Sequence, residues 1–141
     1  MNVSMVRVKL NQETWELASF VENHIRALVK DCFQDEDTVY VIVSPGEMRK
    51  AVGKGGRHIL EMQQRLNKKI RVVEFCEPAE EFIKNLIYPL AVEQISEQDT
   101  YYALRDRSLK TKGLLIGRGR KNLRFLNRAV QRFFNKEVKV V

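Results

Sequence analysis

Two glycine-rich segments with the same plan constrain this chain more than any other feature. The first is Val52-Gly53-Lys54-Gly55-Gly56-Arg57-His58-Ile59, and the second is Ile116-Gly117-Arg118-Gly119-Arg120-Lys121-Asn122-Leu123. Glycine allows backbone angles and close approaches that other residues do not. Helix-patterned sequence follows each segment, so free amide groups and the positive end of a helix dipole should face it. A cationic glycine loop at a helix start favours phosphate binding.

The similarity between the two halves extends beyond these loops. Gly53 and Gly117 lie 64 residues apart, and the sequence Asn67–Val73 matches Asn135–Val141 at an offset of 68. The difference of four residues predicts that the helix after the second loop is about one turn longer. The chain therefore reads as two copies of one unit. We predict domains over residues 1–76 and 77–141.

Each copy is predicted as helix, strand, strand, helix, glycine loop, helix and strand. The first copy has a short additional strand over 5–10, and its hydrophobic pattern then gives helices over 12–23, 47–52 and 57–66 and strands over 26–33, 38–44 and 69–75. The second gives helices over 78–88, 109–116 and 121–134 and strands over 91–96, 100–105 and 137–141. Segment 26–33 also fits a longer first helix. We assign it to a strand because its counterpart follows Pro89 too closely to be helical. The predicted fold class is α+β, with mixed three-stranded sheets and helices packed on one face.

The charge of the chain favours a polyanionic partner. The net charge is +7 over 141 residues, which points to nucleic acid or an anionic membrane surface. Between Arg49 and Arg71 there are eight Lys/Arg and one acid, and between Arg105 and Arg132 there are ten and one. Each basic block contains one glycine loop. No apolar run approaches the roughly 18 residues of a membrane span, and the start does not read as a signal peptide. We expect a cytoplasmic protein with no membrane partner.

Catalytic and cofactor signatures are missing from the sequence. Neither glycine loop fits the Walker pattern or a full dinucleotide fingerprint. His24 and His58 look isolated, so a nucleophile and base pair has no support. Cys32 and Cys76 have no metal-ligand spacing and make no disulfide framework. We therefore expect no enzyme activity, no catalytic residue, no cofactor and no metal.

A glycine loop of the form Gly-x-x-Gly between two helices of a three-stranded unit resembles a KH domain. Two such units in direct succession resemble the tandem KH domains of NusA transcription factors, in their short archaeal form. The resemblance rests on the first loop, on the second loop, and on the junction Val72–Asn85, whose sequence is Val-Val-Glu-Phe-Cys-Glu-Pro-Ala-Glu-Glu-Phe-Ile-Lys-Asn. It covers nearly the whole chain. It implies binding of single-stranded RNA, with the loop clamping the sugar-phosphate backbone and bases lying in an adjacent groove.

The resemblance identifies candidate RNA-binding residues by position. They are Gly53, Lys54, Gly55, Gly56, Arg57, Gly117, Arg118, Gly119, Arg120 and Lys121 in the loops, with Arg124 and Arg128 on the following helix. The second loop departs from the pattern, because Arg120 stands where the first has Gly56. A positive φ at an arginine would be costly, so we expect a weaker clamp there. Arginines every four residues from Arg120 to Arg132 predict a stronger electrostatic contact, although a solvated helix face is the plainer alternative.

The resemblance also implies partners and a process. It predicts a monomer that acts on nascent RNA together with RNA polymerase, in transcription elongation or termination. A KH-domain protein of ribosome assembly or RNA processing is the alternative within RNA binding. A nucleotide-dependent enzyme that uses the glycine loops is the alternative from another class.

Overall fold

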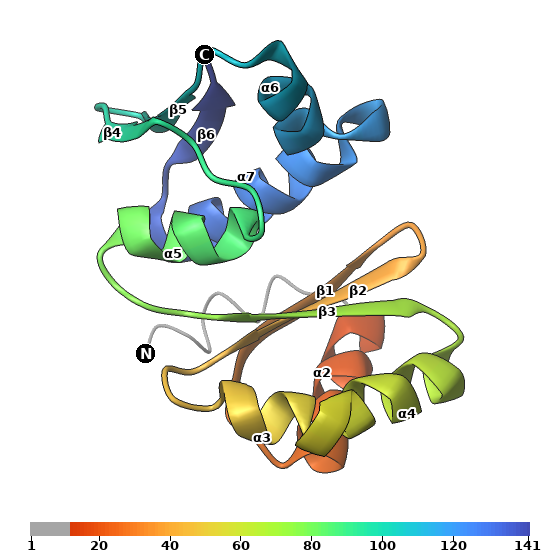
Figure 1. Ribbon diagram of the computed structural model, residues 1–141. Helices are drawn as coiled ribbons and strands as arrows, with labels where there is room; N and C mark the ends of the chain where they lie inside the picture. Colours follow the sequence, from red (N-terminus) through yellow and green to blue (C-terminus); the bar gives the residue numbers. More distant parts are fainter. Residues whose placement is uncertain (1–11) are drawn as a thin grey trace. The chain divides into compact units, whose positions relative to one another are not determined.

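The computed structural model describes residues 12–141, and the strand predicted over 5–10 lies outside this range. Contacts divide the chain into two compact units, the first ending at Phe75 and the second spanning Cys76–Val141 (Figure 1). The two units contain the same order of helices and strands.

The first element of the described part of the first unit is helix α2 (Gln12–Ile25), two residues longer than predicted. Strands β1 (Val29–Asp35) and β2 (Thr38–Val43) follow, then helix α3 (Met48–Val52). The first glycine loop contains the short 3-10 turn η1 (Lys54–Gly56) and leads into helix α4 (Arg57–Leu66). Strand β3 (Lys69–Glu74) closes the unit.

The second unit repeats this order with helix α5 (Ala79–Ile87), strands β4 (Gln94–Glu97) and β5 (Tyr101–Arg105), and helix α6 (Leu109–Ile116). The 3-10 turn η2 (Arg118–Arg120), helix α7 (Lys121–Phe134) and strand β6 (Glu137–Val140) complete it. Helix α7 has 14 residues and α4 has 10, so the prediction of one extra turn is confirmed. None of the helices described has the length and apolar character needed to cross a membrane.

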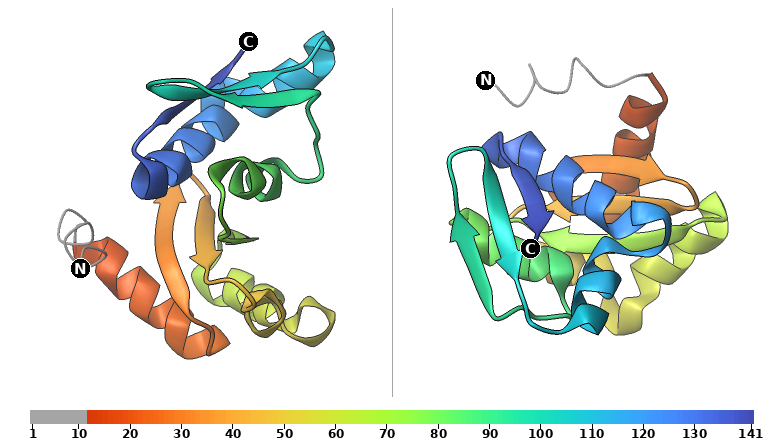
Figure 2. Two further views of the ribbon diagram at one scale, coloured as in Figure 1. Left: turned by 90° about the vertical axis from the view of Figure 1, so that its left-hand side faces the viewer. Right: turned by 90° about the horizontal axis from the view of Figure 1, so that it is seen from above.

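Within residues 12–141, each unit has one three-stranded mixed sheet, with strand orders β1-β2-β3 and β4-β5-β6. The first two strands form an antiparallel hairpin, and the third pairs parallel to the second. A parallel pair needs a crossover connection, and here the crossover is the helix–loop–helix segment that contains the glycine loop. The α+β fold class is confirmed. Figure 2 shows the β4–β5 hairpin of the second unit along its length.

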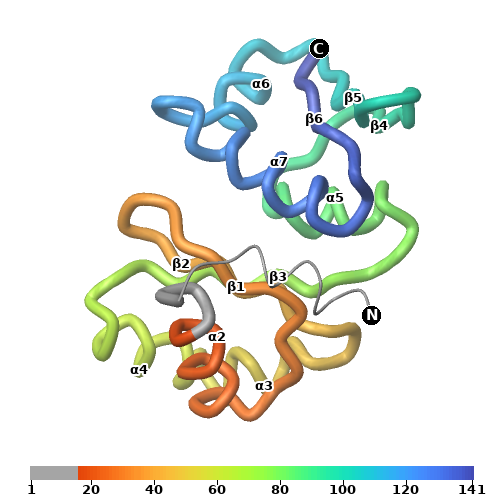
Figure 3. The backbone as a smooth tube through the Cα atoms, turned by 180° about the vertical axis from the view of Figure 1, so that it is seen from behind, coloured from red at the N-terminus to blue at the C-terminus, as the bar shows by residue number. Residues whose placement is uncertain are grey.

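Helices α2, α3 and α4 of the first unit pack against one face of its sheet (Figures 1 and 3). Alternate residues of β2 share a face, and Val39, Val41 and Val43 all belong to the core cluster. The same cluster contains Val21 of α2, with residues of α3 and α4. Met62, at the centre of α4, is fully buried in it.

The core of the second unit is built around aromatic side chains of α5 and α7. Phe82 is fully buried. Its ring meets that of Phe133 edge-on at 5.9 Å and that of Phe134 at 6.1 Å. Such pairs are worth about 0.5–1.5 kcal/mol beyond the buried area. This contact is consistent with the predicted inward position of the two phenylalanines.

Several predicted boundaries were wrong, among them the starts of β1, α5 and β4. Strand β1 starts at Val29 rather than residue 26, because Arg26 has a positive φ of 54° that interrupts the chain after α2. Pro78 is the extended residue before α5 rather than its first helical residue. Strand β4 begins at Gln94, three residues later than predicted.

Candidate nucleic-acid interface

The two glycine loops have the same backbone conformation. Gly53 has φ 78° and ψ 166°, and Gly117 has φ 79° and ψ 165°. This region of the backbone map is open almost only to glycine. In both loops the glycine amide also ends the preceding helix, donating to Arg49 O at 2.9 Å in the first unit and to Gly113 O at 2.9 Å in the second. The sequence pattern therefore encodes one turn, used twice.

A side chain five residues after this glycine fixes the loop in each unit. His58 Nδ1 bonds to the carbonyl of Lys50 at 2.8 Å, and Asn122 Nδ2 donates to the carbonyl of Leu114 at 2.9 Å. A Cβ atom on Gly53 would lie 2.8 Å from His58 Cγ. A Cβ atom on the second glycine would lie 2.9 Å from Asn122 Cγ. The glycine is thus required both by its dihedral angles and by this close approach.

His58 and Asn122 were missed as loop residues by the sequence reasoning. The sequence did contain a signal for this role. Both residues lie five positions after the first loop glycine of their copy, and both side chains can form a hydrogen bond with a carbonyl group. The prediction that His58 is isolated was wrong. Its ring lies 6.2 Å from that of His24, and it is half-buried against the loop.

The rest of each loop is left-handed and open to solvent. Gly55 and Gly119 have φ values of 64° and 60°, and no atom lies within 4 Å of a Cβ added at either. Arg120 adopts φ 65° and ψ 21°, close to the φ 77° and ψ 17° of Gly56. The second loop therefore keeps the backbone conformation of the first, although a positive φ is costly at an arginine. Arg120 N donates to Gly117 O at 3.0 Å, as Gly56 N does to Gly53 O at 3.1 Å.

The loops present bare backbone beside positive charge. Within the described residues, no side chain caps the start of α4 or α7. The first amide groups of these helices, those of Arg57 and Lys121, donate to the loop carbonyls of Lys54 and Arg118. The exposed candidate residues are Lys54, Gly55, Arg57, Arg118, Gly119, Arg120, Arg124 and Arg128; Gly53, Gly56, Gly117 and Lys121 are partly exposed. The structure thus brings the predicted residues of each copy together around its own loop.

The arginine of the first loop is held by a carboxylate. Arg57 Nε donates to Glu61 Oε2 at 3.1 Å, and His24 Nε2 lies 3.2 Å from Glu61 Oε1. The hydrogen bond from Arg57 lowers the pKa of Glu61 below its ordinary value of 4.5, with a smaller contribution from His24. Phe125 stands at the corresponding position of α7 and is buried. The first loop therefore carries an acidic partner that the second lacks at this position.

The arginine row of α7 begins at the second loop. Arg124 Nη1 donates to the carbonyl of Gly119 at 2.8 Å, which places a guanidinium against the loop backbone. Arg128 is exposed one turn further along. Arg132 is only partly exposed, and its guanidinium lies 5.0 Å from the ring centre of Phe133. The exposed part of the predicted row therefore comprises Arg120, Arg124 and Arg128.

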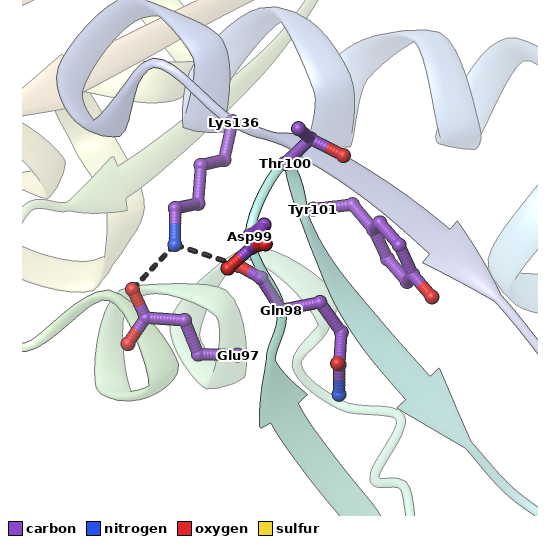
Figure 4. A pocket seen from close by; sticks show the side chains of 6 residues that line it. All are labelled: Glu97, Gln98, Asp99, Thr100, Tyr101 and Lys136. Atoms are coloured by element: carbon purple, nitrogen blue, oxygen red, sulfur yellow. Dashed lines mark hydrogen bonds and ion pairs between the residues drawn. The ribbon is translucent and has the colours of Figure 1, made fainter.

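A hollow in the second unit has a different character. It measures about 580 Å³ and is lined by Glu97, Gln98, Asp99, Thr100, Tyr101 and Lys136 (Figure 4). Lys136 Nζ donates to Glu97 Oε2 at 2.6 Å and to the carbonyl of Gln98 at 2.7 Å. The lysine therefore joins the β4–β5 turn to the start of β6. With its cation paired and two carboxylates in its lining, this hollow is not suited to phosphate.

In the described part of the chain, no group of three His, Cys, Asp or Glu residues comes together in a way that could hold a metal ion. Cys32 is buried in β1, and Cys76 is half-buried just after β3.

Several known proteins are similar to this chain over most of its length. No family model matches the chain. "Probable transcription termination protein NusA" of Halobacterium salinarum is 31% identical over 130 residues, covering 91% of this chain and 94% of that protein. Proteins of the same name from Halococcus morrhuae and Thermoplasma acidophilum are 30% and 23% identical, each covering more than nine-tenths of both chains. The solved "Crystal structure of APE1850" has a TM-score of 0.74 at 27% identity, covering 94% of this chain and 100% of that one.

The similarity spans both units, since each of these alignments covers at least 91% of the chain. The observed α+β fold, the order of elements and the overall length all agree with it. This chain therefore belongs to the family of archaeal proteins named probable transcription termination protein NusA.

Proposed function

We propose that this protein binds single-stranded RNA through two KH domains, 1–76 and 77–141, and acts with RNA polymerase in transcription elongation or termination. The observation that carries the proposal is the glycine loop with one backbone conformation, present twice, with cations around it both times. The relatives of this protein bear the name of a transcription termination protein. That name describes a transcription factor rather than an enzyme.

The loop supplies what a sugar-phosphate backbone requires. Gly55 and Gly119 carry no side chain and have open space around the Cβ position, which leaves room for phosphate oxygens to approach the loop. Lys54 and Arg118, at matching places in the two loops, add charge. In KH domains a Gly-x-x-Gly loop of this kind clamps about four nucleotides of backbone.

The two loops should differ in strength and in salt dependence. In the first loop, Arg57 is paired with Glu61 and must exchange that partner for phosphate. In the second loop, Arg120 replaces a glycine and narrows the approach to the backbone, while Arg124 adds charge beside it. We infer that the first loop clamps the backbone more closely and that the second contributes more through electrostatic attraction.

Substitution of the central loop glycines tests the proposal. Gly55→Asp and Gly119→Asp each place a carboxylate where phosphate should lie. Both positions are sterically open, and Asp tolerates left-handed angles better than most residues, so the fold should survive. We expect each variant to weaken binding of a fluorescent single-stranded RNA homopolymer at near-cellular ionic strength, measured by anisotropy. The matched control is Gly46→Asp, another open glycine with a positive φ (+84°) outside the loops.

Four outcomes would separate the possible functions. Wild-type protein that binds RNA no better than an unrelated basic protein would exclude RNA binding. Unchanged RNA binding by a variant that carries both Gly55→Asp and Gly119→Asp would show that the loops are not the binding site. Co-purification with ribosomal subunits instead of RNA polymerase would favour ribosome assembly or RNA processing. A nucleotide-induced rise in melting temperature would favour the enzyme alternative.

The arginine row gives a separate prediction about salt. Replacing Arg124 and Arg128 with Gln should lower RNA affinity and flatten its dependence on salt, because each lost phosphate contact on a single strand reduces the slope of log K against log salt by about 0.7. Arg107→Gln is the control, since that arginine is paired with Glu93 at 2.9 Å. An unchanged slope in the double variant would remove the row from the binding surface.

A further inference from the structure

Both histidines of the chain lie in the first unit, near its glycine loop. They are His24 in α2 and His58 in α4, and the second unit contains no histidine. The His24 ring is stacked on that of Phe20 at 6.0 Å and meets the His58 ring edge-on at 6.2 Å. Histidine is the side chain that ordinarily gains or loses a proton near neutral pH. Histidine therefore accompanies only one of the two loops.

One carboxylate of α4 joins His24 to the arginine of the first loop. Glu61 Oε2 accepts the bond from Arg57 Nε at 3.1 Å, and its other oxygen, Oε1, lies 3.2 Å from His24 Nε2. The side chain of Arg57 is 76% exposed, whereas that of His24 is 16% exposed. Glu61 therefore lies between a cation that can turn to solvent and an imidazole that is fixed by its surroundings.

A phosphate at the loop changes the balance between these two partners. In the free protein the arginine neutralises Glu61, and its hydrogen bond lowers the pKa of that carboxyl group. When Arg57 turns to a phosphate, the carboxylate loses this partner and stays beside His24. A carboxylate within a few ångströms favours the charged form of an imidazole. Phosphate binding and protonation of the histidine should therefore support each other.

We propose that RNA binding at the first loop is coupled to the uptake of one proton by His24, because Glu61 passes from Arg57 to the protonated imidazole. His24 and Glu61 are positioning residues, since they act on the RNA through Arg57. An ionised carboxylate can only accept hydrogen bonds, so Nε2 of the neutral ring carries the hydrogen that faces Glu61. The added proton comes from solvent, binds Nδ1 of the same ring, and returns to solvent when the RNA leaves.

This inference rests on the proposed RNA binding and adds how the first loop responds to pH. The second loop should lack the response, because Phe125 occupies the position of Glu61 there. By reciprocity, any proton that favours RNA is itself favoured by RNA to the same extent. Affinity should therefore rise as the pH falls.

The other ionisable groups near His24 identify one competing explanation. Elements β1, α3 and α4 pack against α2. Their charged or titratable residues are Lys30, Asp31 and Asp35 of β1, Arg49 and Lys50 of α3, and Arg57, His58, Glu61 and Arg65 of α4. Of these, Glu61 and His58 contact the His24 ring. A proton on His58 would also add charge beside the loop, so the two histidines need separate variants.

Affinity measured against pH tests the proposal. The probe is a fluorescent uridine homopolymer, whose bases carry no group that titrates near neutral pH. The protein is the full chain with Gly119→Asp, so that the first loop dominates binding. Its affinity should rise about fivefold as the pH falls from about 8 to about 5.5, as expected for the gain of one partly exposed ion pair. The gain is present below the titration of the free protein and is lost as the pH rises through that of the RNA complex.

Two histidine variants identify the group that takes up the proton. His24→Gln keeps an amide that can donate to Glu61 but cannot be protonated, so the affinity should no longer depend on pH. His58→Asn is the matched control, because Asn122 makes the same bond to a carbonyl in the second loop. This control should keep the pH dependence of the parent protein.

A variant of the carboxylate separates the exchange from a simple charge effect. Glu61→Gln releases Arg57, so it should bind RNA about two- to fivefold more tightly than the parent protein at about pH 8. Its affinity should not depend on pH, because the protonated imidazole has no carboxylate to receive. Weaker binding by Glu61→Gln at this pH would overturn the exchange, since it would mean that the carboxylate helps Arg57 to reach the phosphate.

The titration of His24 followed by NMR is an independent measurement on the unaltered protein. Addition of the same RNA should move this titration to higher pH. A protein that binds no RNA at any pH overturns both this inference and the proposed function. RNA binding with an unmoved His24 titration, or with a pH dependence that survives in His24→Gln, overturns the coupling alone. A pH dependence that disappears in His58→Asn assigns the proton to His58 and also overturns the coupling.

Discussion

Replacing Gly117 with Ala should destabilise the second unit much more than replacing Gly119, only two residues away. A Cβ on Gly117 would lie 2.9 Å from the side-chain amide of Asn122 and 3.0 Å from its backbone nitrogen. The amide would have to leave its 2.9 Å bond to the carbonyl of Leu114. Strain at these dihedral angles costs about 1–3 kcal/mol, and the lost hydrogen bond costs about 1 kcal/mol.

The sum is about 2–4 kcal/mol for Gly117→Ala. Gly119→Ala has open space around the new atom and only left-handed strain of about 1–2 kcal/mol. Lower entropy of the unfolded chain offsets about 0.5–1 kcal/mol in both variants, so it cancels when they are compared. We therefore expect a difference of about 1–2 kcal/mol between the two variants. Urea unfolding followed by far-ultraviolet circular dichroism measures it.

Two further variants separate the close approach from the dihedral strain. In the double variant Gly117→Ala with Asn122→Ala, the obstructing amide is absent. The loss of stability in the double variant should therefore be about 1 kcal/mol smaller than the sum of the losses in the two single variants. Gly53→Ala and Gly55→Ala should repeat the difference in the first unit, where His58 is the obstructing side chain. Equal losses for Gly117→Ala and Gly119→Ala would refute the reasoning.

Three other predictions concern stability and titration. Ser108→Ala should cost about 1 kcal/mol in urea unfolding, because the hydroxyl accepts a bond from the start of α6 at 3.1 Å; an unchanged midpoint would exclude the cap. Gly113→Ala should stabilise by about 0.5–1 kcal/mol in the same assay, because this helical glycine has open space for a Cβ, and a loss would show hidden crowding. The pKa of Glu61 is lowered in the folded protein, so ionised Glu61 stabilises the fold above its ordinary pKa of 4.5. This contribution to stability is lost as the pH falls through the lower pKa of the folded state. Carboxyl titration by NMR should show this pKa rising in Arg57→Gln, and an unshifted value would mean that the ion pair is not formed in solution.

Local sequence was enough to predict most elements of both units. The alternation and β-branched content of β2 and the spacing of Met62 and its neighbours in α4 specify backbone type without distant contacts. The offset between the copies predicted the extra turn of α7. Boundaries such as the start of β1 were missed, because a positive φ at Arg26 is not written in any short pattern.

The sequence by itself determined that the chain has two glycine loops, each between two helices, with cations concentrated around both. Tertiary structure alone decided how those loops are held. The bonds from His58 and Asn122 join residues eight apart across a turn, and the Glu61–His24 contact joins residues 37 apart. Arg120 takes a glycine-like conformation because the helices on both sides fix the loop, and the cost at one residue is smaller than that of rebuilding the turn. Periodicity and composition describe the neighbours along the chain, whereas these contacts depend on which side chains folding brings together.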